Sequence, residues 1–220
     1  MLLQLKTPPT AFPVGFDELK YHMRLDSDFE LRTIRSYLLA AVMYVENLCG
    51  PLITQTWNQF EQHFPSEWHW RRAMFTESDT VYMGGSRRRH RHHDFELGEP
   101  TVQSIAQITY TLSGGTVVTL PSTVYALQSN GQWHNKIVLQ RGQEWPEVPL
   151  SRGNPICLQY VCGYGDTGAS VPAPITQAIL LLVSMWYENR EPVLTGPGSQ
   201  MVQLPFAVDA LLANYRWEGF

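Results

Sequence analysis

Apolar side chains recur every three or four residues in several stretches of the chain, the spacing typical of an amphipathic helix. The longest such stretch covers residues 31–48 and follows "SDFE", in which Ser27 and Glu30 form a capping box with Ser27 as N-cap and Glu30 at N3. A shorter one covers residues 16–24, and a last one begins at Phe206, which it places on the apolar face. The pattern therefore predicts helices near both ends of the chain.

A fourth helix is predicted for residues 174–187, where Pro174 suits the first helical position. This segment is apolar almost all round, so we expect it to be buried or to lie at an interface. One small domain offers limited cover for such a helix, and a neighbouring subunit supplies more. Leu182 and Trp186 are therefore candidate residues for a contact with another subunit.

Between these helical ends the period changes to two. Residues 52–64 alternate and are rich in β-branched and aromatic side chains, which is typical of a strand. Further strands are expected in "VQSIAQITY", "TVVTLPSTVYAL", "KIVLQ" and "PICLQYVCGYG", and "SGG" supplies glycines for a hairpin turn between the first two.

These elements predict an α+β fold in which both chain ends form a helical bundle and an all-β domain, a sandwich or a barrel-like sheet, is inserted between them. The expected parts are an N-terminal helical part at 1–51, the β domain at 52–169, and a C-terminal helical part at 170–220 that packs with 1–51.

Composition places few further limits. The chain has 220 residues, a formal net charge of −4 and 44% hydrophobic residues, enough for a packed core. Its three cysteines do not form a disulfide framework and are expected to be small core residues in a reducing compartment. No apolar run has the length of a membrane span or of a signal peptide, so a soluble protein without membrane contact is expected.

The mildly acidic body carries one basic run, "GGSRRRHRHHD". Arg87, Arg88, Arg89 and Arg91 are candidates for contact with DNA phosphate or with an acidic protein neighbour, because the guanidinium donates hydrogen bonds in pairs. The alternative is a solvated loop that touches nothing, which is common for charged runs. The histidines among these arginines lack the spacing of a zinc site, so no metal is expected.

No catalytic residue or cofactor is expected either. "GYGDTG" at 163–168 matches the dinucleotide-binding pattern, but the predicted helix begins too late to hold a pyrophosphate at its N-terminus. A strand-to-helix turn that needs glycines is the simpler interpretation. The sequence also lacks a nucleophile elbow, a zinc-protease motif and a Walker loop, so an enzyme is not expected.

The C-terminal segment combines aromatic side chains with an arginine, the composition of interface hot spots. Tyr215, Arg216, Trp217 and Phe220 are therefore predicted to dock on another chain, with Trp217 as anchor and Arg216 paired to a carboxylate. The alternative is that Trp217 folds back on the chain's own helices.

Four stretches in their order along the chain resemble the head–tail connector (adaptor, or head completion) family of tailed bacteriophages with an inserted β domain. They are "LKTPPTAFPVGFDELKYHMRLD", "LCGPLITQTWNQF", "VPAPITQAILLLVSMWYENRE" and "LPFAVDALLANYR". The resemblance covers both helical ends and the strand after Gly50, and it assigns no role to the arginine–histidine run.

The resemblance implies a structural virion protein without enzymatic activity. Such adaptors form a ring of about twelve copies beneath the portal. The resemblance therefore implies the portal or a neighbouring subunit as the partner of the candidate interface residues Leu182, Trp186, Tyr215, Arg216, Trp217 and Phe220. They extend the DNA channel, which double-stranded DNA passes without sequence recognition, and they offer a platform to the next tail or neck protein. The expected place is the neck of the virion, and the host cytoplasm during assembly. The alternative is a cytoplasmic ligand-binding module or hydrolase-like enzyme that uses the β domain.

Overall fold

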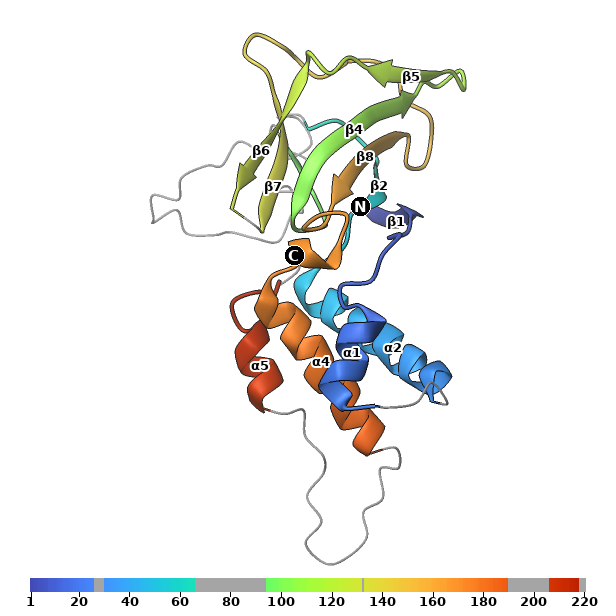
Figure 1. Ribbon diagram of the computed structural model, residues 1–220. Coiled ribbons are helices and arrows are strands. Elements are labelled where there is room, and N and C mark those ends of the chain that lie inside the picture. The colour runs from blue at the N-terminus through green and yellow to red at the C-terminus, as the bar shows by residue number, and fades with distance from the viewer. Residues whose placement is uncertain (26–29, 66–93, 132, 190–205, 218–220) are drawn as a thin grey trace, which may run out of the picture. The chain divides into compact units, whose positions relative to one another are not determined.

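A computed structural model describes residues 1–25, 30–65, 94–131, 133–189 and 206–217 (Figure 1). It confirms the α+β class. The chain divides into two compact units, each assembled from separate segments. The β unit comprises Met1–Lys6, Trp57–Gly98 and Ser104–Val161. The helical unit comprises Thr7–Thr56, Glu99–Gln103 and Cys162–Phe220.

The strands form one five-stranded and one three-stranded sheet. The first has the order β1 (Leu2–Thr7), β2 (Gln55–Glu61), β8 (Ile156–Cys162), β4 (Val102–Thr111) and β5 (Val117–Leu120). The second has the order β3 (Phe95–Glu96), β7 (His134–Leu139) and β6 (Tyr125–Asn130). The pairs β4–β5, β6–β7 and β3–β7 are antiparallel.

The predicted hairpin at "SGG" is confirmed. Ile108 pairs with Leu120 and Thr111 with Val117 across β4 and β5. Gly115 takes a φ of +86° in the turn, a conformation that glycine adopts without a steric penalty. The Leu112 amide donates to the Thr116 carbonyl at 2.9 Å, which closes the turn.

Two strands were not predicted. β1 lies at the edge of its sheet and has no buried residue to mark it, since five of its six residues are exposed and Leu3 is half-buried. An edge strand with one neighbour does not need the alternation that identifies a half-buried strand. β3 has two residues, too few for any periodic pattern.

Alternation is strongest in β8, whose buried residues are Ile156, Leu158, Tyr160 and Cys162. An aromatic cluster covers another part of the β unit. Phe64 stacks on Trp145 with ring centroids 5.7 Å apart, and Phe95 meets the edge of Trp145 at 5.0 Å. Large aromatic side chains with offset or edge contacts supply much of the apolar burial of a small domain.

The helical unit contains α1 (Phe16–Met23), α2 (Leu31–Cys49), α4 (Ala173–Glu188) and α5 (Phe206–Leu212). In Figure 1, α4 lies alongside α2, α1 and α5. Their shared core includes Leu19 of α1, Leu38 and Val45 of α2, Ile179 of α4 and Leu212 of α5. Of the described helices, none is long and apolar enough to cross a membrane.

Three details of the helix predictions are wrong or lie outside the described residues. α2 begins at Leu31, with Glu30 as its N-cap, so Glu30 is not at the third helical position of a capping box. The Glu30 carboxylate instead accepts a hydrogen bond from the Tyr187 hydroxyl. Ser27 lies outside the described residues. Phe206 is 87% exposed, because α5 turns Val208 and Leu212 toward the core.

Candidate functional site

The two candidates on α4 pack against the chain's own core. Leu182 is fully buried, next to Ile175 and Ile179 of the same helix in one apolar cluster. Trp186 is half-buried and packs against that cluster. Their place in a subunit or portal contact stays a prediction, and of the two only Trp186 keeps solvent-exposed surface.

The C-terminal segment contacts the helical unit as far as it is described. The Trp217 amide donates to the Leu48 carbonyl at 2.7 Å, which satisfies one of the free carbonyls at the end of α2. Arg216 pairs with Asp209 of α5 at 2.5 Å, with both side chains exposed. Tyr215 packs against the helical core, and Phe220 lies outside the described residues. Docking of this segment on another chain stays a prediction.

The basic run also lies outside the described residues. Arg87, Arg88, Arg89 and Arg91 are all within residues 66–93, and their predicted contact with DNA or with an acidic neighbour stays a prediction.

The glycines of "GYGDTG" serve close approaches inside the helical unit. Gly163 has a φ of +121°, and a Cβ there would lie 2.6 Å from the Ile53 carbonyl carbon. A Cβ at Gly168 would lie 2.5 Å from the Pro13 carbonyl oxygen. A short 3-10 turn, η1 (Gly168–Ser170), separates these glycines from the start of α4 at Ala173. This geometry supports the strand-to-helix turn over a dinucleotide site.

Two half-buried carboxyl groups, Glu46 and Glu99, lie in the helical unit near the end of α2. Glu46 Oε1 accepts hydrogen bonds from the Leu52 amide at 3.1 Å and from Gln55 Nε2 at 3.3 Å. Burial raises the pKa of Glu46, and burial together with the charge of Glu46 raises the pKa of Glu99 to about 7. Both groups disfavour their charged forms, as expected for carboxyls with little access to water.

Burial raises the pKa of all three cysteine thiols. Burial raises the pKa of Cys49 to about 11 and raises that of Cys162, so neither thiol is a reactive thiolate. Cys49 and Cys162 are buried and Cys157 is half-buried, all three as free thiols, close to the predicted core role. Among the residues that the structure describes, no cluster of His, Cys, Asp and Glu could hold a metal ion.

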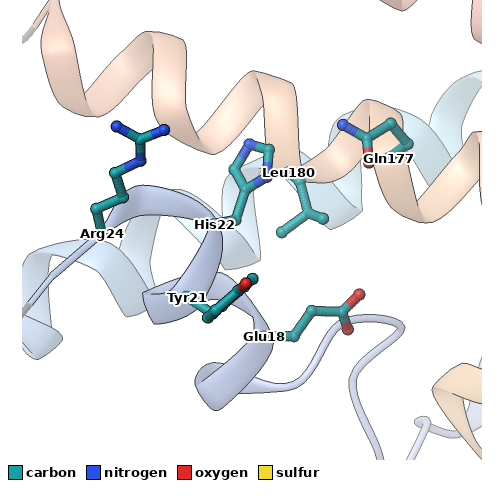
Figure 2. A pocket seen from close by; sticks show the side chains of 6 residues that line it. All are labelled: Glu18, Tyr21, His22, Arg24, Gln177 and Leu180. Carbon is teal, nitrogen blue, oxygen red and sulfur yellow. The ribbon is translucent and has the colours of Figure 1, made fainter.

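A hollow of about 520 Å³ lies between α1 and α4, within the helical unit (Figure 2). Leu180 projects from α4 toward α1 and forms an apolar floor that is 5% exposed. Glu18, Tyr21 and Arg24 line it from the α1 side, together with His22, and Gln177 completes the rim. The mixture of both charge signs with an exposed tyrosine suits a protein surface better than a small-molecule site, which is usually enclosed and mainly apolar.

The sequence analysis missed this hollow. Leu19 faces the core and defines the inner side of α1. The helical period therefore places Glu18 and Tyr21 on the outer side. Nothing in the sequence predicts that α4 runs beside them.

No model of a protein family matches the sequence, and no curated protein matches it. Solved structures do match over the whole chain. A chain in the neck of an empty gene transfer agent particle, computed with C6 symmetry, aligns with a TM-score of 0.69 and 19% identity, and covers 100% of this chain and 97% of its own length. A chain in the native particle's neck, computed with C12 symmetry, gives 0.65 and 20% with the same coverage.

The chain has the fold of these neck proteins. A third structure, the virion of the native gene transfer agent particle, gives a TM-score of 0.67 at 20% identity, again over 100% of this chain and 97% of that one. The comparison confirms, at the level of the fold, the resemblance to phage connectors that was based on four short stretches. It also spans the rest of the β part, of which the stretches covered only the strand after Gly50.

Proposed function

We propose that the protein is a structural component of the neck of a phage-like particle, a head–tail adaptor. The observation that carries the proposal is the match in fold over the whole chain to proteins of gene transfer agent necks. A full-length match matters because it includes the residues of both units. The buried thiols and the absence of a metal cluster among the described residues give no support to a catalytic role.

In this proposal the chain forms a closed ring beneath the portal, of about twelve copies. The symmetry used for the similar necks, C6 and C12, supports a ring. Double-stranded DNA passes through the channel without sequence recognition, and a net charge of −4 suits a channel in which DNA must slide. The portal above and the next tail or neck protein below are the other proposed partners, which the chain contacts as the particle assembles in the host cytoplasm.

In this proposal the helical part and the β part of the chain make different contacts. Helices α1 and α2 from residues 1–51 and helices α4 and α5 from residues 170–220 share one core, which supports a bundle built from both ends. We assign ring contacts to this bundle, and contacts with the next neck protein or with DNA to the β part at 52–169 and its basic run. Trp186, Tyr215, Arg216 and Trp217 are the proposed contacts with the portal or with a neighbouring subunit.

Deletion of the gene from the phage or particle-producing host tests the proposal. We expect filled heads without attached tails in electron micrographs, and restored particles when the gene is supplied from a plasmid. Particles with normal tails after deletion would contradict a neck function. A plasmid copy with Arg87, Arg88, Arg89 and Arg91 replaced by serine then tests the basic run, since lost DNA retention supports a contact there and wild-type particle yield supports a solvated loop.

A further inference from the structure

Three large side chains on α1 and α2 of the helical unit are exposed to water. Tyr21 of α1 is 89% exposed, and Met43 and Leu39 of α2 are 64% and 44% exposed. Exposed apolar area costs roughly 25 cal/mol per Å², and neighbouring positions of this kind mark contact surfaces more often than single ones do. Leu39 and Met43 are four residues apart on one helix, so they lie on the same face.

These two side chains belong to a longer exposed stripe on α2. At steps of three and four residues, the exposed positions are Arg32, Arg35, Ser36, Leu39, Ala40, Met43 and Asn47. The stripe begins with two arginines, becomes apolar in its middle and contains no acidic residue. Arg35 lies 6.0 Å from the Phe16 ring centroid of the same chain, so Arg32 is the arginine with the freer approach to another molecule.

Along α1, the residues beside the hollow are first acidic and then aromatic, which complements the basic and then apolar residues of the α2 stripe. Asp17 and Glu18 are exposed in the first turn of α1, and Tyr21 follows one turn later beside the apolar floor at Leu180. An α-helix rises ~1.5 Å per residue, so acid and tyrosine are separated by about 5 Å along α1. On α2, Arg32 precedes Leu39 by seven residues, which is about 10 Å by the same rise. On both helices the charged position therefore precedes the apolar one, and the two charges are opposite in sign.

We propose that the α2 stripe of one copy docks into the α1–α4 hollow of the next copy. Met43 and Leu39 cover Tyr21 and Leu180, and Arg32 pairs with Asp17 or Glu18. This proposal rests on the ring proposed above and specifies the contact between neighbouring copies in it. The stripe and the hollow are different surfaces, so the contact is head-to-tail, and head-to-tail contacts produce rings when the rotation closes.

Engineered disulfides test the contact in the full chain. Tyr21→Cys and Met43→Cys are combined in a Cys157→Ser background, and the protein is concentrated, oxidised and separated on a non-reducing gel. We expect a ladder of covalent multimers beyond the dimer. Each single cysteine variant, and the pair Tyr21→Cys with Val117→Cys, should give none, because Val117 is similarly exposed but lies in the β unit. A product that stops at the dimer, or no product, would overturn the head-to-tail contact.

Charge reversal gives a second test that does not depend on cysteine chemistry. Arg32→Glu and Glu18→Lys should each reduce assembled species in sedimentation, and the two together should restore them. Circular dichroism checks that each variant folds, and Glu188→Lys, an exposed site at the end of α4, is the control that should leave assembly unchanged. If the wild-type protein is present in particle necks but no reversal affects assembly, the contact is wrong and the neck function stands. Absence of the wild-type protein from particles would defeat the neck function itself.

Discussion

At the scale of single residues, a buried glutamine is central to the β unit. Gln59 is fully buried, and its Nε2 donates to Glu61 Oε1 and to the Glu96 carbonyl, each at 2.8 Å. Its Oε1 accepts from the Gly98 amide at 2.9 Å and from the Tyr160 hydroxyl at 3.4 Å. One side chain thus satisfies polar groups of β2, β8 and the segment after β3, which would otherwise be buried without partners.

Gln59→Leu should lower the free energy of unfolding by roughly 3 kcal/mol, because the Gly98 amide and the Glu96 carbonyl lose their partners in the core. Gln107→Leu is the matched control. Gln107 is an exposed glutamine of β4 that donates to Gln159 at 3.0 Å, and its loss should change stability by about 0.5 kcal/mol or less. Urea denaturation of both variants measures the difference, and equal effects would show that the buried network contributes little.

Glu99 makes the stability of the helical unit depend on pH. Its pKa is about 7 when folded, above the ordinary value of 4.5, so the folded state favours the protonated carboxyl. The contribution of Glu99 to the free energy of unfolding is therefore fully present below about pH 4.5 and is lost as the pH rises through about 7. At pH 8, Glu99→Gln should be more stable than the wild type by roughly 2 kcal/mol. A difference of one pKa unit corresponds to ~1.4 kcal/mol, and solvent screening reduces the effect.

Denaturation curves at pH 5 and pH 8 measure this effect. Glu99→Gln should gain little at pH 5, and Glu188→Gln, an exposed carboxylate in the same unit, should gain little at either pH. A Glu99→Gln variant that is no more stable than the wild type at pH 8 would refute the assigned burial of Glu99.

The alternation of polar and apolar residues along the sequence does not predict that these polar side chains are buried. Gln55 and Gln59 are buried in β2, whereas Trp57 between them is half-buried, so polarity alone assigns the wrong side chains to the core. A glutamine is buried where hydrogen-bond partners are available, and the partners of Gln59 other than Glu61 lie 37 to 101 positions away in sequence. Such long-range contacts leave no local pattern.

At the scale of elements, segments with strong periodicity were predicted well. The helices α1, α2 and α4 and the β4–β5 hairpin lie where the pattern indicated, because a buried apolar face fixes both period and length. The edge strand β1 and the two-residue β3 lack such a face and were missed. Phe206 was misassigned because α5 is only seven residues long, which leaves its face ambiguous by one position.

The turn between β8 and α4 should tolerate no side chain at Gly163. A Cβ would lie 2.6 Å from the Ile53 backbone, so Gly163→Ala forces backbone movement and should cost about 3 kcal/mol. Gly142→Ala is the control, since Gly142 also has a positive φ, +79°, but a Cβ there would have nothing within 4 Å, and the change should cost only about 1 kcal/mol. Thermal unfolding of the two variants compares them, and similar melting temperatures would contradict the close approach.

Helix α4 provides a prediction about packing. Leu182→Ala should cost about 3 kcal/mol, within the range for fully buried leucines that leave a cavity. Leu39→Ala, at a site that is 44% exposed on α2, should cost below about 1 kcal/mol in the unassembled protein. The comparison is made at low concentration by chemical denaturation. If both variants lose similar stability, Leu39 is covered within one chain and its proposed role between copies fails.

At the scale of the whole molecule, each unit is assembled from segments that are far apart in sequence. The helical unit takes residues 7–56, 99–103 and 162–220, and the β unit takes the segments between them together with the first six residues. The periodicity of local segments was therefore enough to predict the fold class. The order of four short stretches indicated the resemblance, which the fold comparison confirms. The hollow at α1 and α4 needed the tertiary arrangement, because its two walls are more than 150 residues apart.

The central claim is that the protein is a ring component of a particle neck. Cryo-electron microscopy of the neck in purified particles from the host tests it most directly, with the chain identified in the same particles by mass spectrometry. The account predicts a ring of copies between portal and tail, with about twelvefold symmetry, whose density accommodates α1, α2, α4 and the five-stranded sheet. Particles with complete necks in which this chain is absent, or a reconstruction whose neck density cannot hold this fold, would contradict it.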